Sequence, residues 1–404
     1  MQNRLPIVFI LITLVIDSMG IGLILPVMPD LIQDVSGAGL ADAAIWGGVL
    51  STSFAAMQFL FGPTVGNISD RFGRRPILLA SLLVLAVNYT VMAVAGSIWF
   101  LLLLQILSGI VASTQTVATA FMADISKAED KAANFGLIGA AFGVGFVLGP
   151  LIGGLLGEFG HRAPFVAAAI LAASNLVFGL LVMPETVTAA IRRPFRWARA
   201  NPFGAFMNTG RMPGVTSLLL IFFTYEFAFF VYPAIWAYFT TARFGWEPAM
   251  IGLSLASFGI SMAVVQGTLI RPLVNRLGER GAIVYGLCLN VCAFLALGLV
   301  TNGWIALVLT PMTALGAVVT PSLQGIMSKT VPDDAQGELQ GLIASARSVA
   351  IVFSPLVMTS VFATFTQPSA PVFLPGAPFL LSMSLMFVCG AILYLSPRPA
   401  AVGP

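Results

Sequence analysis

Apolar runs recur along the chain from its beginning to its end. A helix needs about 20 apolar residues to cross a bilayer, and helix formation lets such a segment satisfy its backbone hydrogen bonds without water. We therefore predict twelve membrane-spanning helices. They are expected at residues 5–29, 45–68, 76–96, 98–123, 132–157, 163–183, 213–240, 248–270, 281–301, 303–328, 338–365 and 376–396.

Composition agrees with a chain whose surface mostly faces lipid. Of the 404 residues, 58% are hydrophobic and 9% are charged, whereas a soluble domain carries about 25% charged residues. The first run is too long, and too poor in small residues at its end, for a removable signal peptide. The net charge of +3 is dispersed through loops, which argues against a nucleic-acid partner.

The basic residues predict the orientation. If the N-terminus is cytoplasmic, 16 of the 19 Lys and Arg residues fall in cytoplasmic segments. Arg162 and Arg243 would face outward, and Arg347 would lie within a span. Because cytoplasmic loops carry the excess of Lys and Arg, we expect both termini in the cytoplasm and the protein in a bacterial inner membrane.

An internal repeat divides the chain. At an offset of 205 residues, the segment 70–75 aligns with 275–280, Gly149-Pro150 with Ser354-Pro355, and 122–124 with 327–329. Coincidences at one offset indicate duplication. We predict six-helix bundles at 1–183 and 213–404, joined by a polar linker at 184–212, with a substrate site between two bundles that alternate in access.

Few residues carry catalytic or ligand chemistry. The single histidine, His161, falls in a short polar connection, and Cys288, Cys292 and Cys389 lie inside apolar runs. These spacings do not make a metal site. We therefore expect neither a metal nor a cofactor, and no enzymatic activity.

Two glycine-containing motifs stand out. Between the second and third spans, glycines and charges form a loop that can turn tightly and exchange ion pairs between states; its residues are Gly66, Asp70, Arg71, Gly73, Arg74 and Arg75. In the fifth span, a smooth glycine face allows close helix approach and a proline bends the helix; its residues are Gly136, Gly145, Gly149, Pro150, Gly153 and Gly154. An ordinary positive loop and a generic packing face are the alternative interpretations.

With these motifs the chain resembles the major facilitator superfamily, in its drug:proton antiporter branch and particularly the tetracycline efflux pumps. Segments 17–29, 244–246 and 336–341 are also similar to those pumps. The resemblance implies an all-α membrane fold of two pseudo-symmetric six-helix bundles, a monomer, and export of small organic compounds in exchange for protons. It also implies that Asp70 engages the other half near the start of the eleventh helix.

Three positions depart from that family. The chain has Asn88, Gln105 and Asn290 where the resemblance implies charged residues tied to substrate and proton handling. Neutral amides cannot carry a proton in the same way. Neither tetracycline specificity nor the family's proton route can therefore be transferred directly.

Three charged residues remain within the spans, namely Asp17, Glu226 and Arg347. A charge at the bilayer centre costs at least about 2.5–3.5 kcal/mol, so each requires a partner or a water-filled cavity. We hypothesise that Asp17 and Glu226 bind protons and substrate, with Arg347 adjusting one of them. A structural ion pair without a transport role is the alternative.

Aromatic and amide side chains are candidates for the rest of a cavity that binds an amphiphilic compound. These candidates are Gln58, Asn88, Gln105, Gln115, Tyr225, Phe229, Tyr232, Trp236, Asn290 and Gln324, with Asn175 and Gln266 as further polar residues. A transporter that anchors an anionic metabolite on Arg347 remains a second interpretation. A membrane receptor or scaffold without transport is a third.

Overall fold

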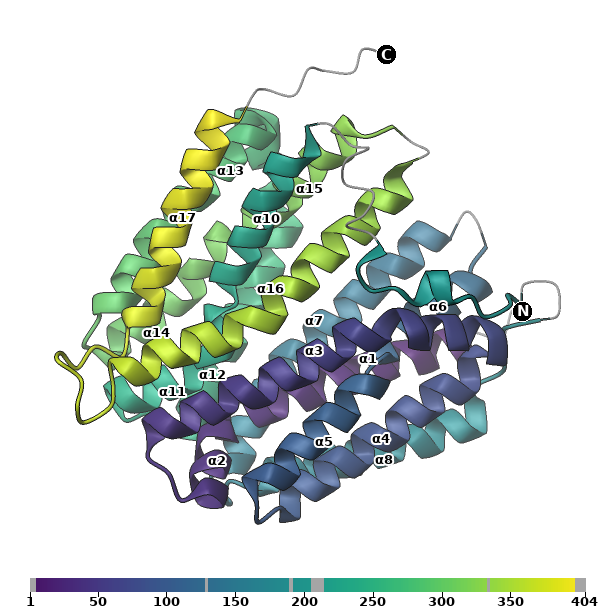
Figure 1. Ribbon diagram of the computed structural model, residues 1–404, viewed down its shortest axis with the longest axis horizontal. Coiled ribbons are helices and arrows are strands. Elements are labelled where there is room, and N and C mark those ends of the chain that lie inside the picture. The colour runs from purple at the N-terminus through teal and green to yellow at the C-terminus, as the bar shows by residue number, and fades with distance from the viewer. Residues whose placement is uncertain (1–4, 128–129, 189–191, 205–213, 333–334, 397–404) are drawn as a thin grey trace. The chain divides into compact units, whose positions relative to one another are not determined.

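The structure is a computed structural model that describes residues 5–127, 130–188, 192–204, 214–332 and 335–396 (Figure 1). Throughout these ranges the ordered elements are helices, which confirms the predicted all-α class. Contacts divide the chain into two compact units. The first unit contains Met1–Gly37, Ser53–Pro202 and Glu247–Ala256, and the second contains Ala38–Thr52, Phe203–Trp246 and Ser257–Pro404. The boundaries at residues 183 and 213 stay a prediction.

In the first unit, α1 packs along α7 and α8, and α4 packs along α8 and α5. Its helical elements are α1 (Leu5–Ile24), η1 (Leu25–Val27), α2 (Met28–Ser36), most of α3 (Leu40–Phe72), α4 (Arg74–Val94), α5 (Ile98–Val111), α6 (Thr114–Ile125), α7 (Lys131–Gly157), α8 (Ala163–Val182) and η2 (Trp197–Ala200). The core formed by α1, α4, α6 and α7 is apolar and includes Phe9, Phe121 and Met122.

In the second unit, α10 packs against α16 and α17, and α13 packs against α15 and α17 (Figure 1). Its helical elements are α10 (Val215–Phe229), α11 (Val231–Phe244), α12 (Pro248–Val264, of which the part from Ser257 belongs here), the π-helical turn η4 (Val265–Leu269), α13 (Ile270–Leu299), α14 (Gly303–Thr313), η5 (Ala314–Val318), α15 (Val319–Thr330), α16 (Gln336–Thr364) and α17 (Ala377–Leu395).

The described residues contain eleven helical segments that are long and apolar enough to cross a membrane, one of which, Pro248–Leu299, has 52 residues. At a rise of about 1.5 Å per residue, this segment is more than twice as long as the ~30 Å hydrocarbon core. The helix is interrupted at Gly278, whose φ of 69° and ψ of 169° are not helical. The segment therefore provides the two spans predicted at 248–270 and 281–301, which agrees with twelve crossings.

Four of the predicted spans are interrupted rather than continuous helices. Breaks occur at η1, at Ala112–Ser113 between α5 and α6, at Phe230 between α10 and α11, and at η5. Proline explains three of them, because Pro26, Pro233 and Pro321 cannot donate a backbone N–H to the preceding turn.

The breaks follow the repeat offset of 205 residues. Leu25 in η1 corresponds to Phe230, and Ala112 corresponds to Ala317 in η5. The loop glycine Gly73, with a φ of 117°, corresponds to Gly278, with a φ of 69°. At both positions φ lies in the region that favours glycine. The duplicated sequence thus places the same interruptions in both halves.

Candidate functional site

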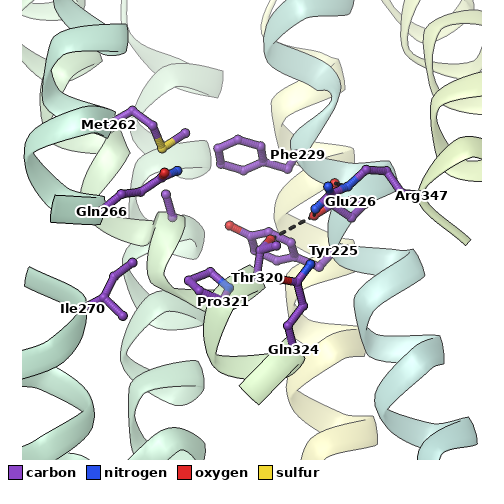
Figure 2. A pocket seen from close by; sticks show the side chains of 11 residues that line it. Tyr225, Glu226, Phe229, Met262, Gln266, Ile270, Thr320, Pro321, Gln324 and Arg347 are labelled. Carbon is purple, nitrogen blue, oxygen red and sulfur yellow. Dashed lines mark hydrogen bonds and ion pairs between the residues drawn. The ribbon is translucent and has the colours of Figure 1, made fainter. Parts of the chain in front are cut away.

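Two charged residues predicted within the membrane meet in the second unit (Figure 2). Glu226 lies on α10 and Arg347 on α16, with Arg347 Nε 3.1 Å from Glu226 Oε2 and Nη2 3.2 Å from Oε1. Thr320 on α15 donates its hydroxyl to Glu226 Oε1 at 2.9 Å. The guanidinium of Arg347 and the hydroxyl of Thr320 together provide hydrogen bonds to a carboxylate that would be costly to bury alone.

This pair borders a cavity of roughly 340 Å³. Figure 2 shows Glu226 and Arg347 on one side of it, with Met262, Gln266 and Ile270 opposite. The lining comprises Tyr225, Glu226, Phe229, Met262, Gln266, Ile270, Ala317, Thr320, Pro321, Gln324 and Arg347. Large apolar surfaces combined with a few polar anchors are typical of a site for a small organic molecule.

Irregular helical turns shape this cavity. Gln266 lies in the π-helical turn η4, and Ala317 lies in the 3₁₀ turn η5. The carbonyl oxygen of Gly316, freed where the helix breaks, accepts hydrogen bonds from Asn290 Nδ2 at 3.0 Å and from the Tyr225 hydroxyl at 3.2 Å. Buried carbonyl groups require such partners, so these two side chains stabilise the break beside the cavity.

The first unit uses the same device at the equivalent position. Val111 is related to Gly316 by the offset of 205, and its carbonyl oxygen accepts a hydrogen bond from Ser81 Oγ at 2.9 Å. Gln58 Nε2 donates to the neighbouring carbonyl of Ala112 at 3.2 Å. Gln58 and Asn290 therefore support helix breaks in the structure.

Several predicted cavity residues lie elsewhere. Tyr232 and Trp236 belong to a buried aromatic cluster with Phe379. Asn290 is fully buried. Of the predicted residues, the cavity of the second unit brings together Tyr225, Glu226, Phe229, Gln266, Gln324 and Arg347.

The remaining candidates lie in the first unit. Asp17 on α1 interacts with the Thr114 hydroxyl on α6, and no Lys or Arg within the described ranges pairs with it. Asn88 is buried, Gln105 is half-buried, and Gln115 is exposed at the start of α6. The two carboxylates predicted within spans therefore differ, because Glu226 is paired with a cation and Asp17 has no such partner among the described residues.

Sequence reasoning missed Thr320 and Met262. We considered amide and aromatic residues within spans, but a hydroxyl or thioether inside an apolar run usually indicates ordinary packing. Thr320 corresponds to Gln115 at the repeat offset of 205 residues. Because Gln115 was itself a predicted cavity residue, this correspondence could have indicated Thr320 as a further one.

The charged motif predicted as a loop lies mostly in helices, with Asp70 at the end of α3, Arg74 at the start of α4 and Gly73 between them. It forms an ion-pair network within the first unit. Arg74 Nη1 lies 2.6 Å from Asp70 Oδ1, and Arg74 Nε lies 3.2 Å from Asp124 Oδ2 on α6. The second unit repeats the latter pair with reversed charges. Lys329 Nζ lies 2.9 Å from Glu279 Oε1, and both positions follow the offset of 205. Attraction is retained although each sign has changed.

Glu185, in the predicted linker, also contacts this motif. Its carboxylate accepts hydrogen bonds from the backbone N–H groups of Arg74 at 2.9 Å and Arg75 at 3.2 Å. These N–H groups begin α4 and have no partner within the helix. Further along the linker, Arg193 N–H donates to the carbonyl of Asp70 at 3.2 Å. The predicted linker thus holds the junction between α3 and α4 in place, a role that we had not predicted.

Replacing Glu185 with alanine should lower the stability of the protein by about 1 kcal/mol, as expected for loss of a helix N-terminal cap. Thermal unfolding of the purified protein in detergent measures this effect. Glu158→Ala serves as the control, because Glu158 is an exposed glutamate at the end of α7. Equal unfolding temperatures for the two variants would contradict the capping role.

The glycine motif of α7 serves two contacts. A Cβ atom at Gly149 would lie 2.6 Å from the carbonyl oxygen of Met19 on α1, and one at Gly145 or Gly153 would also overlap α1. Gly154 instead faces α12, where a Cβ would lie 2.5 Å from the Pro248 carbonyl oxygen. A Cβ at Gly136 would meet no atom within 4 Å. Close helix packing therefore explains four of the five motif glycines.

Comparison with known proteins identifies the family. The sequence matches the model of the Major Facilitator Superfamily over residues 10–355 and again over residues 218–403. Tetracycline resistance protein, class C, of Escherichia coli is 39% identical over 400 residues, which cover 99% of this chain and 97% of that protein. The class D protein of Salmonella ordonez is 35% identical over 401 residues, covering 99% of both chains.

Among solved structures, the human organic anion transporter MFSD10 has a similar fold. Its TM-score is 0.70 at 23% identity, covering 97% of this chain and 100% of that chain. The family resemblance deduced from the two glycine motifs is thereby confirmed. The chain belongs to the Major Facilitator Superfamily and is an integral membrane protein that works as a secondary transporter.

Proposed function

We propose that this protein exports small amphiphilic organic compounds across the bacterial inner membrane in exchange for protons. The observation that carries the proposal is the Glu226–Arg347 pair at an aromatic and amide-lined cavity. Relatives named for tetracycline resistance support a drug-like substrate. In this proposal both termini are cytoplasmic and the protein acts as a monomer.

Glu226 is the proposed proton-binding group of the second unit. Its carboxylate is the acidic group of the cavity lining, and one proton neutralises it without forming or breaking any other covalent bond. A substrate group that binds the carboxylate then competes with that proton. Such competition is what exchange requires, because proton and substrate must occupy the site in alternation.

Asp17 is proposed as a second proton site, in the first unit. Thr114 supports its carboxylate, and no basic residue in the described part of the chain pairs with it as Arg347 pairs with Glu226. Intramembrane carboxylates commonly belong to ion and substrate pathways. The ion-pair motif around Asp70 and the glycine face of α7 are proposed to serve the motion between states.

Transport of a simple anion on Arg347 is not favoured by the geometry. Two of the guanidinium nitrogens, Nε and Nη2, already bind Glu226. An anion that required this bidentate fork would have to displace a carboxylate that also binds Thr320.

The proposal is tested by flux in proteoliposomes that contain the purified protein and an acidic lumen. Tetracycline and a panel of amphiphilic drugs are added outside, and uptake is measured together with alkalinisation of the lumen. We expect accumulation of at least one compound, lost when an ionophore collapses the pH gradient. Empty liposomes are the control. Uptake that ignores the gradient, or the absence of uptake for every compound, would contradict proton-coupled export.

A further inference from the structure

The Glu226–Arg347 pair has no net charge, and this limits the kinds of ligand that the cavity can bind. The side chain of Arg347 is 41% exposed and that of Glu226 is 18% exposed, so both can be reached from the cavity. Lining residues that accompany them are uncharged. The cavity therefore carries one positive and one negative charge in direct contact.

Both partners retain unused hydrogen-bonding capacity. A guanidinium has five N–H donors, and a carboxylate accepts at about four lone-pair positions. Arg347 uses Nε and Nη2, and Glu226 Oε2 accepts from Arg347 Nε at 3.1 Å. Among the described residues, Arg347 Nη1 has no acceptor. An anionic group can therefore bind Nη1 while a cationic group binds Glu226, without separating the existing pair.

Net charge then discriminates between ligands. A singly charged ligand leaves one uncompensated charge in a site with low dielectric, and an uncompensated buried charge is strongly unfavourable. A ligand with two adjacent opposite charges keeps the sum at zero and gives each protein charge a new partner. The four charges alternate in sign, so every nearest-neighbour contact is attractive.

Aromatic surfaces beside the pair indicate the rest of the ligand. The fully buried ring of Phe222 supports the Arg347 guanidinium from behind at 5.4 Å. Tyr225 and Phe229, which line the cavity, stack with ring centroids 5.5 Å apart and planes 17° apart. Met262 faces the cavity from α12. The aromatic rings and the polarisable thioether that line the cavity favour a ligand with a ring system. The cavity volume of roughly 340 Å³ accommodates a charged group with its adjoining rings.

We propose that the ligand of this cavity is an aromatic zwitterion whose two charges lie close together and which binds Glu226 and Arg347 at the same time. This inference rests on the proposed function and specifies its substrate class. It also sets the sign of coupling. A proton on Glu226 removes the negative charge that binds the cationic group. The charge of Arg347 stays unchanged, as does the Tyr225 hydroxyl, which donates to the carbonyl oxygen of Gly316.

One scaffold in four charge states tests the proposal. The probes are 2-naphthylalanine as the zwitterion, its methyl ester as the cation, its N-acetyl derivative as the anion, and the N-acetyl methyl ester as the neutral compound. Their binding to the protein in lipid nanodiscs is measured by calorimetry. We expect the zwitterion to bind at least about tenfold more tightly than each of the other probes. A tenfold difference in affinity is a small free energy compared with the cost of leaving one charge in the cavity without a partner.

Variants of the pair should change the preference predictably. Glu226→Gln leaves a positive cavity and should favour the anion, and Arg347→Gln leaves a negative cavity and should favour the cation. Combining Glu226→Arg with Arg347→Glu restores neutrality and should restore preference for the zwitterion. Glutamine matches glutamate in size and keeps an unbranched polar side chain at position 347, so the test does not depend on folding of the exchanged pair.

Three outcomes would overturn the inference. These are an equal or tighter affinity of wild-type protein for a singly charged probe, a preference that the glutamine variants leave unchanged, and no binding of any probe at millimolar concentration. Because equilibrium binding does not require flux, each can occur while proteoliposomes still export a drug against a pH gradient. Conversely, charge selectivity without proton-driven flux would contradict the proposed function and leave the binding mode intact.

Discussion

Glu226→Gln should abolish accumulation of substrate against its gradient, while downhill exchange continues at higher substrate concentrations because the contact with the carboxylate is lost. Glutamine has nearly the same shape and can still accept the hydrogen bond from Thr320, which reaches Oε1 at 2.9 Å in the wild type. It cannot bind and release a proton at neutral pH, so the cycle loses its coupling step. Arg347 loses its carboxylate, but its side chain is already 41% exposed in the wild type and lies over the ring of Phe222, which limits the structural damage.

Two measurements in proteoliposomes separate these effects. Accumulation driven by an acidic lumen should fall to the level of empty liposomes, and exchange of labelled for unlabelled substrate should persist at saturating substrate concentration. Glu247→Gln is the matched control, because Glu247 is an exposed glutamate before α12. Uphill accumulation by Glu226→Gln at the wild-type rate would remove Glu226 from the coupling mechanism and leave Asp17 to be tested as Asp17→Asn.

Gly153→Leu should eliminate transport and strongly destabilise the protein. A Cβ atom at Gly153 would overlap the carbonyl oxygen of Leu23 and lie 2.6 Å from its Cα. These are backbone atoms of α1 and cannot move aside without separating α1 from α7. Overpacking of a tight interface costs about 1–3 kcal/mol and sometimes more, and here it acts where α1 and α7 pack along their length.

Gly139→Leu places the same side chain on the same helix, where a Cβ would meet no atom within 4 Å. Thermal unfolding and flux should be near wild type in this control. Gly136→Leu adds a sharper comparison, since Gly136 belongs to the motif but is equally open. Loss of stability in Gly136→Leu equal to that of Gly153→Leu would contradict the packing explanation of the motif.

Much of the fold could be predicted from the chain alone. Membrane spans depend on local hydrophobicity, because each helix satisfies its own backbone hydrogen bonds in lipid. The boundaries were mostly within a few residues, as for 76–96 and the observed α4 (Arg74–Val94). The offset of 205 also anticipated equivalent positions such as Gly73 and Gly278.

The helix breaks were harder to predict. Pro26, Pro233 and Pro321 were visible in the sequence, but a proline can also lie inside a continuous helix, as Pro150 does in α7 and Pro355 in α16. Whether a helix breaks depends on whether another group donates a hydrogen bond to the carbonyl oxygen that the break leaves without a partner. At Gly316 the donors are Asn290 and Tyr225, which come from other helices, and no local pattern reveals them.

The sequence by itself determined the number of crossings, the internal repeat, and the three charged residues that lie in apolar surroundings. Only the tertiary structure decided which of them meet. Glu226 and Arg347 are 121 positions apart, and Thr320 lies 94 positions from Glu226. Their contact depends on how α10, α15 and α16 rotate and pack, whereas hydrophobicity and glycine spacing are properties of each helix alone. Asp17 has no basic partner among the described residues. Two carboxylates in similar apolar runs, Asp17 and Glu226, can therefore have different environments.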